Sequence, residues 1–121
     1  MSFVRHRVIP TPAFEKELRP LLKRHRSLSK DLLDLEQRLE KEPDLGTRLG
    51  HGLFKVRIAI TSKGKGKSGG ARVITYVITE DREVYLLGIY DKADYDTVDT
   101  KAMRQLAAQL RDGKMPSMQM M

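Results

Sequence analysis

The residues with the clearest capacity for chemistry are lysines and arginines in the middle of the chain. Between Lys55 and Arg72 there are six basic residues and no acidic one. Lys55 and Arg57 are two positions apart, so they share one face of a strand. Arg72 begins the next apolar stretch, and Lys92 follows the one after that. Because converging cations bind phosphate and stabilise charge on its oxygens, we predict a phosphate site made by these four residues.

A glycine- and lysine-rich segment, residues 63–70, connects two of these stretches and carries Lys63, Lys65 and Lys67. Three of its glycines spell G-x-G-x-x-G, but a β-branched stretch follows them where a dinucleotide site needs a helix. A P-loop would require glycine where Thr61 stands. Two interpretations remain: a solvated hairpin connection, or a loop that grips phosphate with backbone and lysine.

Other catalytic chemistries find little support in this sequence. The chain has no cysteine, and His6, His25 and His51 lack the spacing of metal ligands. An acidic run between Asp91 and Asp99 is better explained as capping at the start of a helix. We therefore expect neither a metal nor a cofactor, and catalysis would depend on lysine and arginine.

Composition places these residues in a small basic domain. The chain has 121 residues, a formal net charge of +7 and 40% hydrophobic residues, enough for one core. It has no long apolar run and no apolar stretch after its first arginines, so we expect no membrane span, no secretory signal and a cytoplasmic location. One domain is expected over residues 1–112 and a disordered, methionine-rich tail over 113–121. The positive charge favours a polyanionic partner.

The elements that must position the cations follow from periodicity. A strand over residues 3–9 precedes a helix that is capped by Thr11 and should kink or end early at Pro20. A second helix begins near residue 27 or 29 and ends at Pro43, with one apolar stripe of Leu28, Leu32, Leu35 and Leu39. A loop is expected over residues 43–52.

Three strands follow, over residues 53–61, 71–79 and 83–90, and short connections favour an antiparallel meander. Asp96 or Thr97 should cap a last helix that ends at Gly113. The order β-α-α-β-β-β-α predicts an α+β fold, an antiparallel-rich sheet with helices packed on one face. The leucine stripe should cover the face of Phe54, Val56, Ile58 and Ile60, which leaves Lys55 and Arg57 on the opposite, open face.

Two segments together resemble a known family. Residues 64–76 read GKGKSGGARVITY and residues 84–94 read VYLLGIYDKAD. They resemble the toxins of the RelE superfamily, and most closely the HigB-like branch with a glycine-lysine loop. The resemblance covers residues 14–110. It implies a compact ribonuclease fold that cuts mRNA in the ribosomal A site, and a cognate antitoxin protein that silences it. mRNA, the ribosome and the antitoxin are thus the expected partners.

The resemblance also implies roles for individual residues. Lys55 and Arg57 match the family's basic strand pair, Arg72 its strand arginine and Lys92 the basic residue after the last strand. In such a reaction the RNA 2′-OH attacks the adjacent phosphate and needs a base, and nearby cations lower the pKa of a lysine. We assign Lys55 as the base, with Arg72 and Lys92 stabilising the transition state. Lys63, Lys65 and Lys67 would hold backbone phosphates.

The sequence departs from the family pattern in two places. Val98 stands where RelE members carry a base-orienting tyrosine, so Tyr90 and Tyr95 are the candidates for base stacking. No histidine follows His51, unlike members with a catalytic histidine near the C-terminus. Two alternatives therefore stay open: a ParE-like gyrase poison, and a non-catalytic nucleic-acid-binding relic of the fold.

Overall fold

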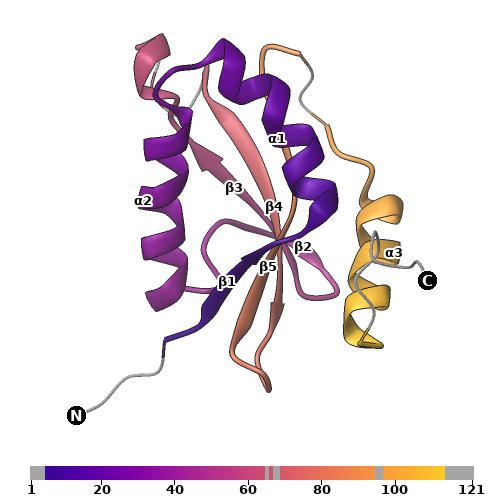
Figure 1. Cartoon of the computed structure of the whole chain (residues 1–121). Coiled ribbons are helices and arrows are strands. Elements are labelled where there is room, and N and C mark those ends of the chain that lie inside the picture. The colour runs from indigo at the N-terminus through magenta and orange to yellow at the C-terminus, as the bar shows by residue number, and fades with distance from the viewer. Residues whose placement is uncertain (1–4, 65, 67–68, 95–96, 114–121) are drawn as a thin grey trace.

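The computed structural model describes residues 5–64, 66, 69–94 and 97–113. In these residues five strands form one sheet and three helices pack against it (Figure 1), which confirms the predicted α+β class. The elements are β1 (Arg7–Pro10), α1 (Pro12–Arg24), α2 (Leu28–Lys41), β2 (Thr47–Gly50), β3 (Leu53–Ile58), the 3-10 turn η1 (Thr61–Lys63), β4 (Ala71–Ile78), β5 (Glu83–Asp91) and α3 (Thr100–Arg111).

The strand order across the sheet is β1-β5-β4-β3-β2. The antiparallel β3-β4-β5 meander is confirmed, while β1 joins the far edge of the sheet parallel to β5. An ion pair between Arg7 and Glu83, which are register partners, accompanies this parallel pairing. The first strand of the chain thus pairs with the last one.

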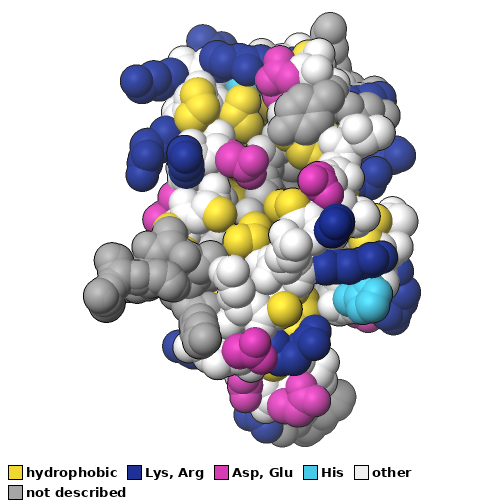
Figure 2. All heavy atoms as spheres, turned by 90° about the vertical axis from the view of Figure 1, so that its right-hand side faces the viewer, with side chains coloured by type: hydrophobic (Ala, Val, Ile, Leu, Met, Phe, Trp, Pro, Cys, Tyr) yellow, Lys and Arg dark blue, Asp and Glu magenta, His cyan; other side chains and the backbone are white. Residues whose placement is uncertain are grey.

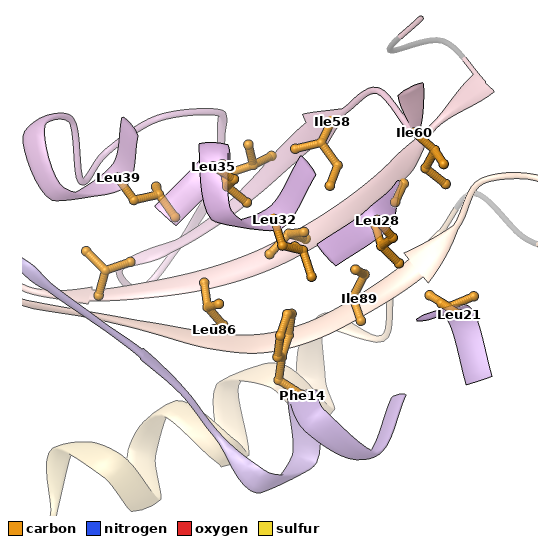
Figure 3. Packing of buried hydrophobic residues seen from close by; sticks show 14 residues of the cluster. Phe14, Leu21, Leu28, Leu32, Leu35, Leu39, Ile58, Ile60, Leu86 and Ile89 are labelled. Carbon is orange, nitrogen blue, oxygen red and sulfur yellow. The ribbon is translucent and has the colours of Figure 1, made fainter. Parts of the chain in front are cut away.

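The main core lies between the sheet and the α1-α2 hairpin (Figure 3). All four leucines of the predicted α2 stripe are at most 5% exposed. They contact Val56, Ile58 and Ile60 of the expected sheet face, together with Phe14 from α1. Phe54 is also buried, and the Arg48 guanidinium lies over its ring, 5.3 Å from the centroid. The periodicity therefore identified this face correctly.

A second core cluster lies on the opposite face, under α3. Ala107 and Leu110 of α3 pack with Leu53, Ile74 and Leu87. Figure 1 shows α2 and α3 on opposite sides of the sheet. Two helices therefore cover the face that the sequence assigned to them, and α3 shields part of the face that carries Lys55 and Arg57.

Helix α1 begins as predicted but runs past its proline. Thr11 caps it by accepting a hydrogen bond from Phe14 N at 3.2 Å, and Pro12 occupies the first turn. The expected early end at Pro20 is wrong, because the helix continues to Arg24. Because Pro20 has no N–H, the carbonyl of Lys16 loses its usual helical donor. Both residues are exposed, so water can hydrogen-bond to that carbonyl.

Two further boundaries differ from the prediction. The loop expected over residues 43–52 contains β2, which forms a hairpin with β3 through His51 and Gly52. Both residues have positive φ, as a type I′ turn requires. Helix α3 is capped by Asp99, whose carboxylate accepts from Ala102 N at 3.1 Å, and not by Thr97; Asp96, the other predicted cap, lies outside the described residues. From residue 114 on, the predicted tail lies outside the described residues.

Candidate functional site

The sheet brings the predicted cations into one row. Arg57 of β3 lies opposite Arg72 of β4, which lies opposite Tyr90 of β5. Neighbouring strands are about 4.8 Å apart and opposed residues share a face, so these three side chains are direct neighbours. Lys55 lies on the same face one step along, opposite Ile74. We call Lys55, Arg57, Arg72 and Tyr90 the cationic row.

An irregularity in β5 places Tyr90 in this row. The register shifts by one residue between Ile74 opposite Gly88 and Thr75 opposite Leu86, so Leu87 is an extra residue on β5. Val84, Leu86 and Ile89 consequently all face the α1-α2 core. Without this bulge, simple alternation would turn Tyr90 toward that core and Asp91 toward the cations.

The members of the row differ in their access to solvent. Arg57 is exposed and Lys55 is half-buried. Arg72 is only 1% exposed, and its Nη1 donates to the carbonyl of Ala71 at 3.1 Å. Across the described part of the chain, no carboxylate forms an ion pair with Lys55 or Arg57. Two accessible cations thus lie beside a buried one.

Lys92 lies next to the end of the segment 63–70, which we call the basic loop. Lys92 is half-buried, and its backbone N–H donates to Gly70 O at 3.0 Å, which closes the end of the β4-β5 pair. Lys63 turns the other way and pairs with Asp91, Nζ to Oδ1 3.1 Å. Lys65, Lys67 and Tyr95 lie outside the described residues.

Asp91 is a buried junction that the sequence analysis did not identify. Its carboxylate is 1% exposed and accepts from Arg24 Nη2 at 3.0 Å, His25 Nε2 at 2.8 Å and Ala93 N at 2.9 Å, besides Lys63. Burial alone would raise the pKa of this carboxyl, but the hydrogen bonds from Ala93, Lys63 and His25 lower it to about 2. Asp91 therefore joins the end of α1 to the start of the basic loop.

A second carboxylate fixes the same loop to α2. Asp31 accepts from Thr61 N at 3.0 Å and from Thr61 Oγ1 at 2.6 Å, and Ser27 Oγ accepts from Ser62 N at 2.9 Å. Burial opposes ionisation of Asp31, yet the hydrogen bonds from Thr61 lower its pKa. The loop, for which the sequence left a solvated and a phosphate-gripping interpretation open, is thus anchored to α2 where it leaves β3.

Replacing Asp91 with asparagine should lower the free energy of unfolding by about 2 kcal/mol at pH 7, because the pKa of this carboxyl falls from 3.8 to about 2 in the folded chain. A carboxylate with a depressed folded pKa stabilises the fold above its unfolded pKa, and this stability is lost as the pH falls toward 2. In urea titrations, the difference in the free energy of unfolding between wild type and D91N should be largest at pH 7 and should shrink below pH 4. The exposed Asp44 gives the control D44N. A stability difference between wild type and D91N that does not change with pH would contradict the lowered pKa of Asp91.

A hollow of about 410 Å³ lies beside Tyr90, between β5, Glu17 of α1 and the start of α3. Val98 and Met103 give it apolar walls. Glu17 accepts from Ile89 N at 3.2 Å, and burial raises the pKa of its carboxyl. Figure 2 shows the side of the molecule that carries α3, where hydrophobic atoms lie exposed between charged side chains. A flat apolar group could enter here against Tyr90.

Together, the fold and the site define a small α+β protein with a cationic sheet face suited to a polyanion. Residues 6–121 match the family described as the RelE toxin of the RelE/RelB toxin-antitoxin system. The chain therefore belongs to the RelE toxin family.

Two solved structures share the fold. One is the toxin-antitoxin complex RelBE2 from Mycobacterium tuberculosis, with 22% identity over 77% of this chain and 98% of that chain and a TM-score of 0.55. The other is a double arginine-to-alanine mutant of Escherichia coli toxin RelE in the free state, with 13% identity over 88% and 97% of the two chains and a TM-score of 0.53. The placement in the HigB-like branch stays a prediction. In the described part of the chain, no helix has the length and apolarity needed to cross a membrane.

Proposed function

We propose that this RelE-family toxin is a ribosome-dependent endoribonuclease that cleaves mRNA without a metal. The observation that carries the proposal is the cationic row, in which Arg57 and Arg72 are register partners and Lys55 lies one step away. Lys55 and Arg57, which form no ion pair with a carboxylate among the described residues, are suited to a phosphodiester. The ribosome would supply the mRNA in an extended, unpaired form.

The proposed reaction is an in-line displacement at phosphorus. The RNA 2′-oxygen forms a bond to the adjacent phosphorus, and the bond from phosphorus to the 5′-oxygen of the next nucleotide breaks. Lys55 Nζ takes the 2′-hydroxyl proton, and the departing oxygen takes a proton from water. The products are a 2′,3′-cyclic phosphate and a 5′-hydroxyl. Arg57, Arg72 and Lys92 offset the charge that grows on the phosphate oxygens.

Tyr90 and the hollow beside it offer a place for a nucleobase. Tyr90 is 4% exposed and forms part of the wall of this hollow. Single-stranded RNA is commonly bound by stacking a splayed base on an aromatic ring. We place the base next to the scissile phosphate there, because Tyr90 and Arg72 are adjacent in the row.

The proposed biological partner is a cognate antitoxin, and the cytoplasm is the proposed location. The RelBE2 match is to a toxin-antitoxin complex, and the matched family is defined by such a system. An antitoxin that covers the cationic row would keep the toxin silent while the two proteins remain bound.

Controlled expression with primer-extension mapping of translated mRNA tests this function. We expect growth arrest, with cuts phased to codons that appear only in messages under translation. Uncut mRNA with DNA breaks and supercoiling defects would instead identify a gyrase poison. Salt-dependent RNA binding without any cleavage would identify a non-catalytic member of the fold.

A further inference from the structure

The sheet edge beside β3 has a hollow that shares Lys55 and Arg57 with the cationic row. Strand β2 pairs with β3 only as far as Thr47 opposite Lys55, whereas β3 continues to Ile58. Beyond that last pair lies a hollow of about 180 Å³, walled by Arg38 of α2 and by Lys55 and Arg57. We call it the edge notch. Arg38 was not among the sequence-predicted site residues.

The backbone of Arg57 faces this notch. Val77 N donates to Gly52 O at 3.0 Å, so the even-numbered residues at this end of β3 turn their backbone groups toward β4. In an antiparallel strand, successive residues point their N–H and C=O groups to opposite sides. The odd-numbered residues of β3 therefore point theirs toward β2 and the sheet edge. The Lys55 carbonyl oxygen also points to this side, because it would collide with a Cβ on Gly46. The N–H of Arg57 therefore points to the edge after β2 has ended.

The chain before β2 does not fill this position. Leu45, which would stand opposite Arg57 if the ladder continued, turns its N–H to Glu42 O at 3.3 Å. Gly46 has a φ of +100° and no side chain, so the turn passes close to β3 without closing the notch. The backbone N–H of Arg57 and three cationic residues consequently border one small space.

Arg38, Lys55 and Arg57 lack the carboxylate partners that other cations have in the described part of the fold. Arg24 and Lys63 form ion pairs with Asp91. Among the described residues no ion pair joins a carboxylate to Arg38, Lys55 or Arg57. Asp34 and Glu42 lie four residues before and after Arg38, yet no ion pair joins either of them to it. An anion in the notch would relieve the mutual repulsion of the three charges.

We propose that the edge notch binds a phosphate of the RNA backbone, with Arg38 as a phosphate-binding residue. The described lining contains no aromatic side chain for a base, and its guanidinium groups and N–H suit phosphate oxygens. The identification of the anion as RNA rests on the proposed function. The expectation that the notch binds phosphate does not depend on that function. RNA would then cross the cationic row and continue around the sheet edge toward α2.

The first experiment uses inorganic phosphate as the probe, added to ¹⁵N-labelled full-length protein at constant pH and ionic strength. The Arg57 amide and the Arg38 Nε–Hε resonances should shift together with one Kd. Substituting Arg38→Gln should weaken this Kd about tenfold, since charge-assisted hydrogen bonds are lost. The matched control Arg19→Gln removes the same charge from an exposed position of α1 and should leave the Kd unchanged.

The second experiment uses a 2′-O-methyl RNA oligonucleotide, which the proposed reaction cannot cleave. For single strands, each phosphate contact contributes about 0.7 to the slope of log Kobs against log salt. R38Q should make that negative slope shallower by about 0.7 relative to wild type, and R19Q should leave it unchanged. Equal slopes for the two variants would overturn the assignment to RNA.

The outcomes separate this proposal from the nuclease itself. An unmoved Arg57 amide, or equal phosphate affinities in R38Q and R19Q, would overturn the edge notch even if translated mRNA is cut. If phosphate binds in the notch but wild-type protein never cuts translated mRNA, the anion site is supported and the endoribonuclease is not.

Discussion

Replacing Lys55 with methionine should lower the rate of mRNA cleavage by about 100- to 10,000-fold, the usual contribution of a general base. Methionine keeps the length and apolar stem of the side chain but cannot accept a proton. Lys55 is half-buried on β3 and makes no ion pair in the described structure, so its loss should leave the fold intact. Cleavage would be measured by primer extension in a reconstituted translation system, with purified variants added at matched concentrations.

Arginine at the same position separates the base from the charge. Arg keeps the cation but is never deprotonated in proteins, so K55R should be as inactive as K55M if Lys55 takes the proton. A K55R protein that cuts at nearly the wild-type rate would show that position 55 supplies only charge. The exposed Lys16 of α1 provides the control K16M, which should cut normally.

Replacing Arg72 with alanine should abolish growth arrest and lower cleavage by about 100- to 1,000-fold, in line with the loss of one preorganised charge donor. Arg72 lies between Arg57 and Tyr90 and is 1% exposed, so its charge acts across a region of low dielectric. Removing it also deletes a large buried side chain, which destabilises the sheet. Thermal unfolding must therefore accompany every activity measurement.

The conservative variant R72K distinguishes catalysis from packing. Lysine retains the charge and most of the volume but lacks the guanidinium fork. We expect R72K to unfold close to the wild-type temperature and still to lose at least about tenfold in cleavage. Arg104→Lys, on the exposed side of α3, should change neither property. A well-folded R72K with wild-type cleavage would assign Arg72 a purely structural role.

The sequence was sufficient for the elements whose pattern is local. The leucines of α2 repeat at helical spacing, and β3 alternates from Phe54 to Ile58, so both elements and the shared face of Lys55 and Arg57 could be predicted. Strand β2 could not be predicted, because its four residues are too few to show an alternating pattern. Only Leu49 faces inward, and the strand ends in a glycine. Its only local signal was His51-Gly52, a turn pair that is less familiar than Asn-Gly.

The site depends on features that no local pattern encodes. Which arginine opposes which residue is a matter of register, and the register of β5 changes at the extra residue Leu87. This bulge separates Tyr90, which joins Arg72, from Asp91, which turns to His25 and Arg24. From sequence, Asp91 was interpreted as part of an acidic run that caps a helix. The structure instead directs it to the other side of the sheet, where it holds the basic loop.

The pairing of β1 with β5 has a consequence for the synthesis of this protein. Arg7 and Glu83 are partners although 76 positions separate them, and the cationic row needs β3, β4 and β5 together. A nascent chain still lacking β5 therefore has neither a closed sheet nor a complete row. The proposed cutting site can therefore assemble only after the residues of β5 have been translated. The ribosome that makes the toxin would thus meet no complete cutting site before Asp91, the last residue of β5, has been added.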